Sequence, residues 1–410
     1  MLATLIRFLV TWFLFHGNLA REIYVLRCAL IRINKLEFFN SPKRNYRLVL
    51  DLSEDKQFYI LTGYNGAGKS RIIKIIHEAF AITRGGKFSS SISRWAFQAS
   101  LSDEVKIRAL KWEMGSASKK DVNDLMQRFF ESELELEEVF AEAEKLGSSS
   151  AKTRFSGDSN KDVEDFFCGS GATLPDLLAK EISPEDYSKK INLVSYIDET
   201  LFFSFPRKVV DSVFAGQGDA SSLDKTLWAL IHAYVSKVAG ADEIKKLISD
   251  LVDVQQAKNK KGLTEKEVSV ILDSAISELK GNAKFDDNVV FHELNEFYGK
   301  TKRKLVWVNE AIHMDVPDEG IIHWTEFSKG EKTLLALMLT VYLYKDTAFF
   351  MFDEPDLSLH VEWQRMLLPA FQRLAPNSQF IIGTHSPFLV MNTSSEEIVN
   401  LAKKYKEVGV

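Results

Sequence analysis

A glycine-rich octapeptide, GYNGAGKS at residues 63–70, contains the residue types that bind a nucleoside triphosphate. It fits the pattern G-x-x-x-x-G-K-[ST] between an apolar run and a segment of helical spacing, the strand–loop–helix context of a phosphate-binding loop. Glycines let backbone N–H groups curl around a phosphate, Lys69 reaches the β- and γ-phosphates, and Ser70 ligates Mg²⁺. We therefore predict ATP and Mg²⁺ as ligands. The residues assigned to nucleotide binding here are Gly63, Asn65, Gly66, Ala67, Gly68, Lys69, Ser70 and Arg71.

A second group of reactive residues is the pair of carboxylates in AFFMFDEPDLSLH, residues 348–360. The apolar run 348–352 predicts a strand buried on both faces, and such a strand presents its last side chains at the edge where a phosphate loop also lies. There Asp353 would bind Mg²⁺ and Glu354 would take a proton from the attacking water. An acidic pair at a strand end is common, so this assignment depends on the phosphate loop.

Two further elements place polar groups at the ends of apolar segments. Ser328 and Gly330 stand directly before a long apolar helix, where a hydroxyl and backbone N–H groups can receive an anion. An ordinary helix cap, with Glu331 in the first turn, explains the same residues equally well. The strand at 380–383 is followed by His385, which could bond the γ-phosphate or have only a structural role.

The elements that must position these residues can be read from apolar spacing. Strand-like spacing at 31–39 and 47–52, separated by SPKRN, predicts a hairpin. The run at 58–63 and the alternation at 105–114 predict further strands, and 69–80 predicts a helix. Alternation resumes at 304–316, and from residue 327 the order is helix, strand, helix, strand. The fold class is therefore α/β.

The middle of the chain has a different composition. Helical spacing recurs at 121–145, 184–203, 223–238, 242–256 and 264–279, with a polar linker at 148–162. We interpret this as a large all-helical insertion, whose run ESELELEE is a solvated face or an acidic docking face. The expected divisions are an apolar arm at 1–25, an N-terminal ATPase lobe at 26–118, the insertion at 119–290 and a C-terminal ATPase lobe at 291–410.

Charge and cysteine content limit the partners and the compartment. A formal net charge of −5 gives no overall attraction to nucleic acid or to an anionic membrane. Cys28 and Cys168 lack CxxC spacing, which excludes a cysteine zinc site and suits a reducing cytoplasm. The first twenty residues resemble a signal peptide, but Arg7 interrupts a run already shorter than the roughly 20 residues of a spanning helix. An over-extended start, a partner contact and real targeting stay open for this arm; we expect a cytoplasmic protein without membrane contact.

Taken together, the motifs resemble a known family. The phosphate loop, S-x-G-E at 328–331, DEPDLSLH at 353–360 followed by Trp363 and Gln364, and THSP at 384–387 stand in the order seen in the SMC/RecF-like branch of ABC ATPases. They are most similar to the OLD-like (overcoming lysogenization defect) ATPases. The resemblance implies an ABC-type fold and a homodimer or higher oligomer in which the signature of one protomer closes over the ATP of the other. The roles it supplies are Ser328 and Gly330 as signature, Asp356 and Ser358 as D-loop, and His385 as switch histidine.

The sequence also departs from the family pattern. Lys329 stands where many ABC proteins have glycine, and Gln98 is the one candidate for a Q-loop glutamine. The chain ends soon after His385, which leaves no room for the Toprim nuclease of OLD enzymes. We therefore expect any nuclease or toxin effector to be a separate polypeptide.

The function expected from these observations is that of an ATP-hydrolysing sensor or regulator subunit in a bacterial anti-phage defence or toxin–antitoxin-like system. The alternative is a RecF-like DNA-repair ATPase that binds duplex DNA through the basic stretches GKTKRK at 299–304 and KNKKG at 258–262, although solvated turns explain both. A transporter subunit is disfavoured, since the insertion greatly lengthens the chain between Lys69 and Ser328.

Overall fold

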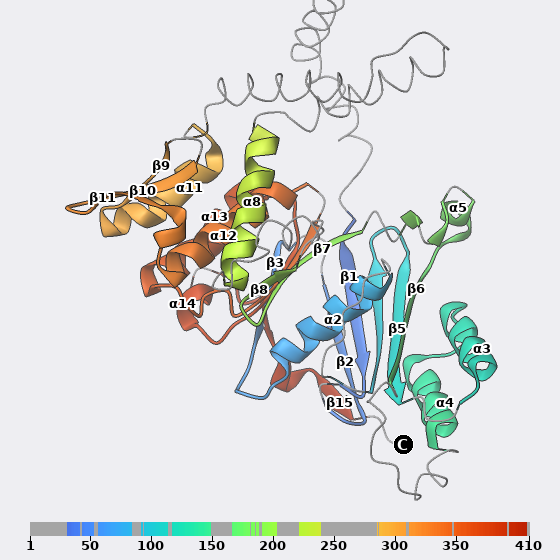
Figure 1. Cartoon of the computed structure of the whole chain (residues 1–410). Coiled ribbons are helices and arrows are strands. Elements are labelled where there is room, and N and C mark those ends of the chain that lie inside the picture. The colour runs from blue at the N-terminus through green and yellow to red at the C-terminus, as the bar shows by residue number, and fades with distance from the viewer. Residues whose placement is uncertain are drawn as a thin grey trace, which may run out of the picture.

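Two large β-sheets lie on either side of one helix, α2 (Lys69–Thr83), in the computed structural model (Figure 1). The structure describes residues 31–407 apart from residues 42, 53–55, 84–91, 93, 114–116, 149–165, 181, 185, 188–190, 203–220, 239–284, 286, 309–310, 347 and 392. The predicted α/β class is confirmed in this part. The apolar arm at 1–25, nearly all of the linker at 148–162 and the helices expected at 242–256 and 264–279 lie outside the described residues.

The first sheet carries the chemical motifs and is mostly parallel. Its order is β14 (Ile398–Asn400), β3 (Phe58–Thr62), β13 (Phe380–Gly383), β12 (Ala348–Asp353), β7 (Asn192–Ile197) and β8 (Thr200–Phe202), with only the β7–β8 pair antiparallel. Its central strands are continuous apolar runs because both faces are covered. In β12, Phe350 and Phe352 enter the core beneath the outer helices, whereas Phe349 and Met351 face α2.

The second sheet is antiparallel and covers the other side of α2. Its order is β15 (Tyr405–Glu407), β2 (Tyr46–Asp51), β1 (Ile33–Phe39), β4 (Trp95–Leu101), β5 (Lys106–Glu113) and β6 (Phe166–Thr173). The strands predicted at 31–39, 47–52 and 105–114 are confirmed as β1, β2 and β5. Apolar spacing did not predict a strand at the position of β4.

Helix α2 is buried on nearly all sides because it is enclosed by the two sheets. Ile72, Ile76 and Phe80 belong to the core that joins both sheets to the helix. A fully buried ion pair, Lys111 Nζ to Glu78 Oε1 at 2.8 Å, connects β5 to α2. The helix that begins at the phosphate loop is thus fixed from both sides.

The outer face of the parallel sheet is covered by α8 (Ser222–Val238), α11 (Val289–Tyr298), α12 (Lys329–Tyr344) and α13 (Val361–Leu374). Beside them lies a small antiparallel sheet of β11 (Gly320–His323), β10 (Ala311–Val316) and β9 (Lys304–Val308). The short helices are α5 (Asp176–Ala179), α14 (Pro387–Val390), η2 (Gly299–Thr301), η3 (Trp324–Glu326) and η4 (Leu401–Lys403).

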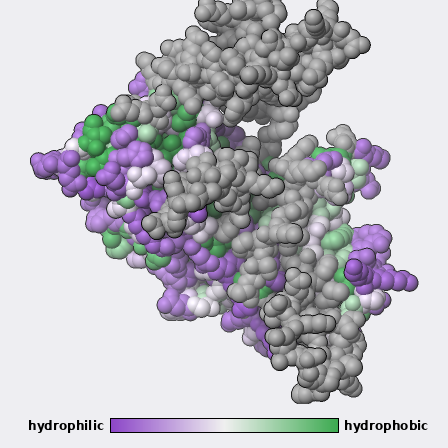
Figure 2. Space-filling view, in the orientation of Figure 1, coloured by the Kyte–Doolittle hydropathy of each residue, from purple (hydrophilic) through white to green (hydrophobic). Residues whose placement is uncertain are grey.

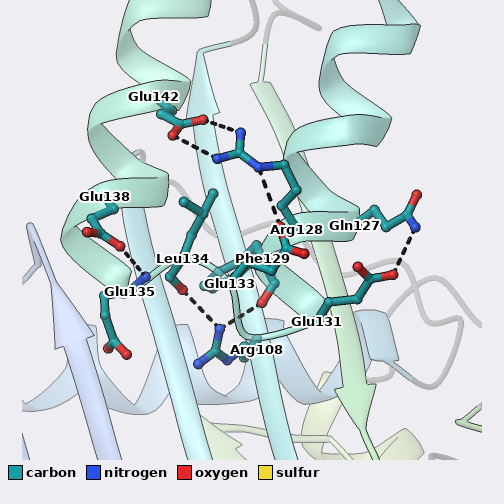
Figure 3. Close-up of polar contacts among 10 residues, drawn as sticks. All are labelled: Arg108, Gln127, Arg128, Phe129, Glu131, Glu133, Leu134, Glu135, Glu138 and Glu142. Atoms are coloured by element: carbon teal, nitrogen blue, oxygen red, sulfur yellow. Dashed lines mark hydrogen bonds and ion pairs between the residues drawn. The ribbon is translucent and has the colours of Figure 1, made fainter.

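The outer face of the antiparallel sheet is covered by the helical pair α3 (Lys119–Phe130) and α4 (Leu136–Ser148). Arg108 of β5 holds the connection between them, since its Nη1 donates to the carbonyls of Phe129 at 2.7 Å and Leu134 at 3.0 Å (Figure 3). In the run ESELELEE the leucines are buried and most glutamates are exposed. Figure 2 shows a largely hydrophilic surface over α3.

The expectation of an all-helical insertion is wrong for the described part of residues 119–290. Helices α3, α4 and α8 are present where helical spacing predicted them, but β6 extends the antiparallel sheet and β7 extends the parallel one. The segment 184–203 was expected to be helical, but its later part contains β7 and β8. A strand buried on both faces and a buried helix give the same apolar run, so spacing alone could not separate them. The division of the chain into lobes stays a prediction.

Within the described residues, no helix combines the length and apolarity that crossing a membrane requires.

Candidate functional site

The phosphate loop connects β3 to α2 and its conformation depends on glycine. Gly63, Gly66 and Gly68 have φ angles of 147°, 80° and 97°, which side chains with a Cβ rarely adopt. A Cβ on Gly63 would lie 2.8 Å from that of Ala67. The loop folds back on itself, because Ala67 N–H donates to the Tyr64 carbonyl at 3.0 Å. This is the compact backbone turn that a helix N-terminus needs in order to surround a phosphate.

Lys69 is the first residue of α2 and is 4% exposed. Its Nζ donates to the Gly63 carbonyl at 3.2 Å and lies 2.6 Å from His385 Nε2. Burial lowers the pKa of Lys69, and the carboxylates of Glu354 and Asp353 counteract this effect. The ammonium group is thus directed back along the phosphate loop, with acidic groups nearby.

The acidic pair ends β12 beside the phosphate loop. Parallel pairing aligns Asp353 with Gly383 of β13 and Gly383 with Leu61 of β3, so residues far apart in the chain meet at one sheet edge. Asp353 is 8% exposed, and burial raises its pKa to about 6, while the hydrogen bond from Ser70 opposes that rise. Glu354 has a φ of 49°, and its N–H donates to the Gly383 carbonyl at 2.7 Å. This left-handed residue turns the chain out of the strand and leaves its carboxylate partly exposed.

The residues that would hold Mg²⁺ lie next to each other. Ser70 Oγ donates to Asp353 Oδ1 at 3.0 Å, which places a hydroxyl and a carboxylate side by side. The described residues contain no group of three or more His, Cys, Asp or Glu side chains that could hold a metal. Mg²⁺ at nucleotide sites takes one or two protein oxygens, with phosphates and water completing the octahedron, so Ser70 and Asp353 fit that ion.

His385 stands between the cation and the candidate base. Its Nε2 lies 2.6 Å from Lys69 Nζ and 3.6 Å from Glu354 Oε1. Because an ammonium group can only donate, Nε2 accepts in the contact with Lys69. The structure thus brings together Lys69, Ser70, Asp353, Glu354 and His385, as the sequence predicted. Their roles remain proposals.

The D-loop residues are held from within the protein. Thr384 Oγ1 donates to Asp356 Oδ1 at 2.8 Å, and burial raises the pKa of Asp356. Gln364 Nε2 donates to the carbonyls of Asp356 at 3.1 Å and Leu359 at 2.9 Å. Ser386 Oγ in turn donates to Gln364 Oε1 at 2.6 Å. Asp356 therefore uses its carboxylate to join the D-loop to the strand that precedes His385.

Ser328 and Gly330 begin α12 and have contacts of their own. Ser328 forms a capping box with Glu331: its Oγ accepts from Glu331 N–H at 3.4 Å, and its own N–H donates to Glu331 Oε2 at 2.8 Å. Arg303 pairs with the same glutamate. Gly330 packs on the D-loop, where an added Cβ would lie 2.6 Å from the Ser358 carbonyl oxygen. The helix-cap interpretation of Ser328 thus holds within the chain, and it leaves the phosphate-contact interpretation open.

Several residues near these motifs were not found from the sequence. Tyr405 of β15 donates its hydroxyl to the Ala67 carbonyl in the phosphate loop at 2.6 Å, and burial raises its pKa. Its segment KKYKE carries no motif, so only strand pairing reveals it. Glu199, in the β7–β8 turn, binds Lys329 with both oxygens at 2.6 Å.

The Q-loop assignment of Gln98 is wrong. Gln98 lies in the middle of β4, where it is 8% exposed and its Nε2 donates to Glu37 Oε2 at 3.0 Å within the antiparallel sheet. A glutamine in an apolar run offers no sequence signal that separates such a core role from a catalytic one.

Of the two basic stretches considered for DNA binding, only GKTKRK lies within the described residues. KNKKG lies outside the described residues. In GKTKRK, Lys300, Lys302 and Lys304 are exposed, whereas Arg303 is bound to Glu331.

A phosphate loop, a carboxylate pair at the end of another strand of the same sheet and a covered parallel sheet define the class of P-loop nucleotide hydrolases. The family model described as "AAA domain, putative AbiEii toxin, Type IV TA system" matches residues 58–392, and the chain belongs to that family. It is an ATPase, in accord with the names of its curated relatives.

Those relatives are two proteins called probable ATPases of retrons. The chain is 22% identical to the Retron Ec83 probable ATPase of Escherichia coli over 422 residues, 91% of this chain and 71% of that one. It is 30% identical to the Retron Vc95 probable ATPase of Vibrio cholerae serotype O1 biovar El Tor over 108 residues, 23% of this chain and 21% of the relative.

Solved structures that resemble the chain are head domains of SMC proteins. The Smc head of Pyrococcus furiosus, bound to the C-terminal domain of ScpA, has a TM-score of 0.37 at 19% identity, covering 88% of this chain and 92% of that one. The SMC head of Thermotoga maritima has a TM-score of 0.38 at 13% identity, covering 92% of this chain and all of that one.

Proposed function

We propose that two copies of the chain enclose two ATP molecules, each held by the phosphate loop of one protomer and the signature of the other. The observation that carries this proposal is the placement of the motifs. Lys69, Ser70 and Asp353 meet at one sheet edge, with Glu354 and His385 beside them. Ser328 and Gly330 have their own contacts with Glu331 and the D-loop. A second chain would supply the missing half of each site.

In this mechanism Glu354 accepts a proton from water as the water oxygen attacks the γ-phosphorus. The bond between the γ-phosphorus and the β–γ bridging oxygen breaks, which gives ADP and phosphate. Lys69 offsets charge on the β- and γ-phosphates, and His385 contacts the γ-phosphate. Mg²⁺, held by Ser70 and Asp353, would neutralise phosphate charge when bound.

At the level of biology, we propose that the ATPase regulates a separate effector, such as a nuclease or toxin, in a defence or toxin–antitoxin-like system. The family description, which names a type IV toxin–antitoxin system, and the two retron ATPases support this setting. The finer resemblance to OLD-like ATPases, the cytoplasmic location and the homodimer belong to the same proposal.

The test of the hydrolytic site is Glu354→Gln, which keeps the shape of the side chain and removes the base. We expect ATP binding to persist, single-turnover hydrolysis to fall by about 10²- to 10⁴-fold, and an ATP-bound dimer to accumulate in mass photometry. Glu362→Gln, at the start of α13, is the matched control and should hydrolyse ATP normally. Hydrolysis at the wild-type rate by Glu354→Gln would rule out Glu354 as the base.

A further inference from the structure

The turn between β7 and β8 consists of two acidic residues, both in the left-handed backbone conformation. Asp198 and Glu199 have φ angles of 49° and 60°, and the flanking residues Ile197 and Thr200 pair with each other. Such two-residue hairpin turns favour Asn-Gly and Asp-Gly, because asparagine and aspartate tolerate positive φ and glycine has no Cβ that is strained there. Glutamate at the second position is a poor choice for the turn itself. Strain of this kind points to a role for the side chain.

Each carboxylate of the turn holds a lysine from a different part of the site. Asp198 Oδ2 lies 2.7 Å from Lys74 Nζ, on the helix that begins with Lys69. Glu199 holds Lys329 Nζ with both oxygens at 2.6 Å, between Ser328 and Gly330 of the signature. The turn therefore spans the phosphate-loop helix and the signature within one chain.

Lys329 is placed where a cation does not help its own helix. It is the first residue of α12, and the positive end of the helix dipole disfavours a positive charge there. Glu199 offsets this effect, but the side chains of Lys329 and Glu199 are 59% and 44% exposed, and ion pairs this exposed contribute little to stability. Lys332 on the same turn differs, since it is only 14% exposed in its pair with Asp224. Lys329 is thus a cation that could exchange Glu199 for another anion.

We propose that Glu199 holds Lys329 in the separate protomer and that the γ-phosphate of the ATP bound by the second copy displaces this carboxylate. Lys329 then becomes a phosphate-contacting residue of the composite site, and Glu199 sets the ATP concentration at which the dimer closes. A terminal phosphate has more negative charge and more acceptor oxygens than a carboxylate, so the exchange favours closure. The inference rests on the proposed two-chain site.

The experiment measures the ATP concentration for half-maximal dimer formation by mass photometry, with Glu354→Gln as the background so that ATP persists. Glu199→Gln removes the ion pair and keeps the strained turn, whereas Glu199→Gly also relieves the strain. We expect both to lower the half-maximal ATP concentration by about two- to fivefold, the range for an exposed ion pair.

Lys329→Gln should raise the half-maximal ATP concentration, and Glu199→Gln combined with Lys329→Gln should match Lys329→Gln alone. Glu396→Gln, which breaks the exposed pair with Lys56, is the control and should change nothing.

Thermal melting separates this role from a structural one. Glu199→Gly should melt at a higher temperature than the parent, because glycine suits positive φ, and yet it should dimerise at lower ATP. Unchanged half-maximal ATP in both Glu199 variants, or a remaining effect of Glu199→Gln when Lys329 is already glutamine, would overturn the proposal while the two-chain site stands. A background protein that stays monomeric at saturating ATP would overturn both.

Discussion

Asp353 and Lys69 are buried at the sheet edge, where burial disfavours the charged form of each side chain. Asp353 is nearly inaccessible, and the hydrogen bond from Ser70 does not compensate for burial, so its pKa rises to about 6. Lys69 is also buried, and its pKa falls. A partner of opposite charge would stabilise the charged form of each group: a nucleotide phosphate for Lys69, and the metal ion for Asp353.

Asp353→Asn should therefore stabilise the protein in the absence of nucleotide and Mg²⁺. The amide oxygen can still accept from Ser70, and no charge is buried. The folded pKa of about 6 lies above the ordinary value of 3.8, so the native state binds the extra proton between these pH values and wild-type stability falls as pH rises through them. We expect the variant to gain about 1–3 kcal/mol in free energy of unfolding at pH 8, and the gain to vanish below about pH 4.

Urea denaturation at several pH values measures that gain. Asp51→Asn is the control, because Asp51 is exposed at the end of β2 and its replacement should have no such effect. A gain for Asp353→Asn that is the same at pH 4 and pH 8 would contradict the attribution to a buried charge.

Lys69→Ala should abolish ATP binding, because one cation and its directed hydrogen bonds to phosphate are lost together. Isothermal titration with ATP and Mg²⁺ measures this, and Lys403→Ala, at an exposed position of η4, is the control. Unchanged affinity in Lys69→Ala would exclude residues 63–70 as the phosphate loop.

At the scale of elements, the start of α12 and the D-loop are fitted to each other. Gly330 leaves no space for a Cβ against the Ser358 carbonyl, and Ser358 Oγ donates to Thr333 Oγ1 one turn later, at 3.3 Å. The D-loop is held to β13 through Asp356 and Thr384. A shift of α12 would therefore displace the D-loop and, through the bond between Asp356 and Thr384, the end of β13 just before His385.

Gly330→Ala tests this fit. The added methyl group must push the D-loop backbone or the helix, at a cost of about 1–3 kcal/mol in stability, as for other overpacked sites. We expect ATP hydrolysis to fall as well, since the D-loop backbone would shift. Gly299→Ala is the matched control, because a Cβ there meets nothing within 4 Å and φ is −58°. Equal melting temperatures for the two variants would show that the contact is not tight.

At the scale of the whole molecule, five layers follow one another: α3 and α4, the antiparallel sheet, α2, the parallel sheet, and the outer helices (Figure 1). The phosphate loop is anchored between the two sheets, and the signature lies on the outer helical layer. In the proposed two-chain site, each protomer would contribute its phosphate loop to one ATP and its signature to the other, so that a two-fold pair of chains would complete both sites reciprocally.

Mixing two defective variants tests that pairing. Ser328→Arg removes a helix cap, which costs about 1 kcal/mol or somewhat more, and also blocks closure over the γ-phosphate of a partner. Ser328→Arg alone should bind ATP and hydrolyse little. Mixed with Lys69→Ala, it should form heterodimers with one complete site, made of the phosphate loop of the Ser328→Arg chain and Ser328 of the other.

Turnover and dimer mass across mixing ratios provide the readout, with chain exchange verified by differently tagged copies. Hydrolysis or ATP-dependent association should rise above that of either variant alone. Neither rising would exclude the two-chain site and leave Ser328 with its capping role only.

The sequence by itself predicted an ATPase and the residues that meet at the sheet edge, because each motif is short and carries its physical requirement locally. Glycines between an apolar run and a helical segment, a lysine at the start of that segment and carboxylates at the end of another apolar run are readable without the fold. Tertiary structure decided what depends on distant partners. Spacing could not show that 192–197 is a strand, because double-sided burial erases the periodicity that separates strands from helices. Nor could it show that Gln98 belongs to the core, that Tyr405 supports the phosphate loop, or that Glu199 holds Lys329. Those contacts exist because strand pairing and layer packing join segments that no local pattern connects.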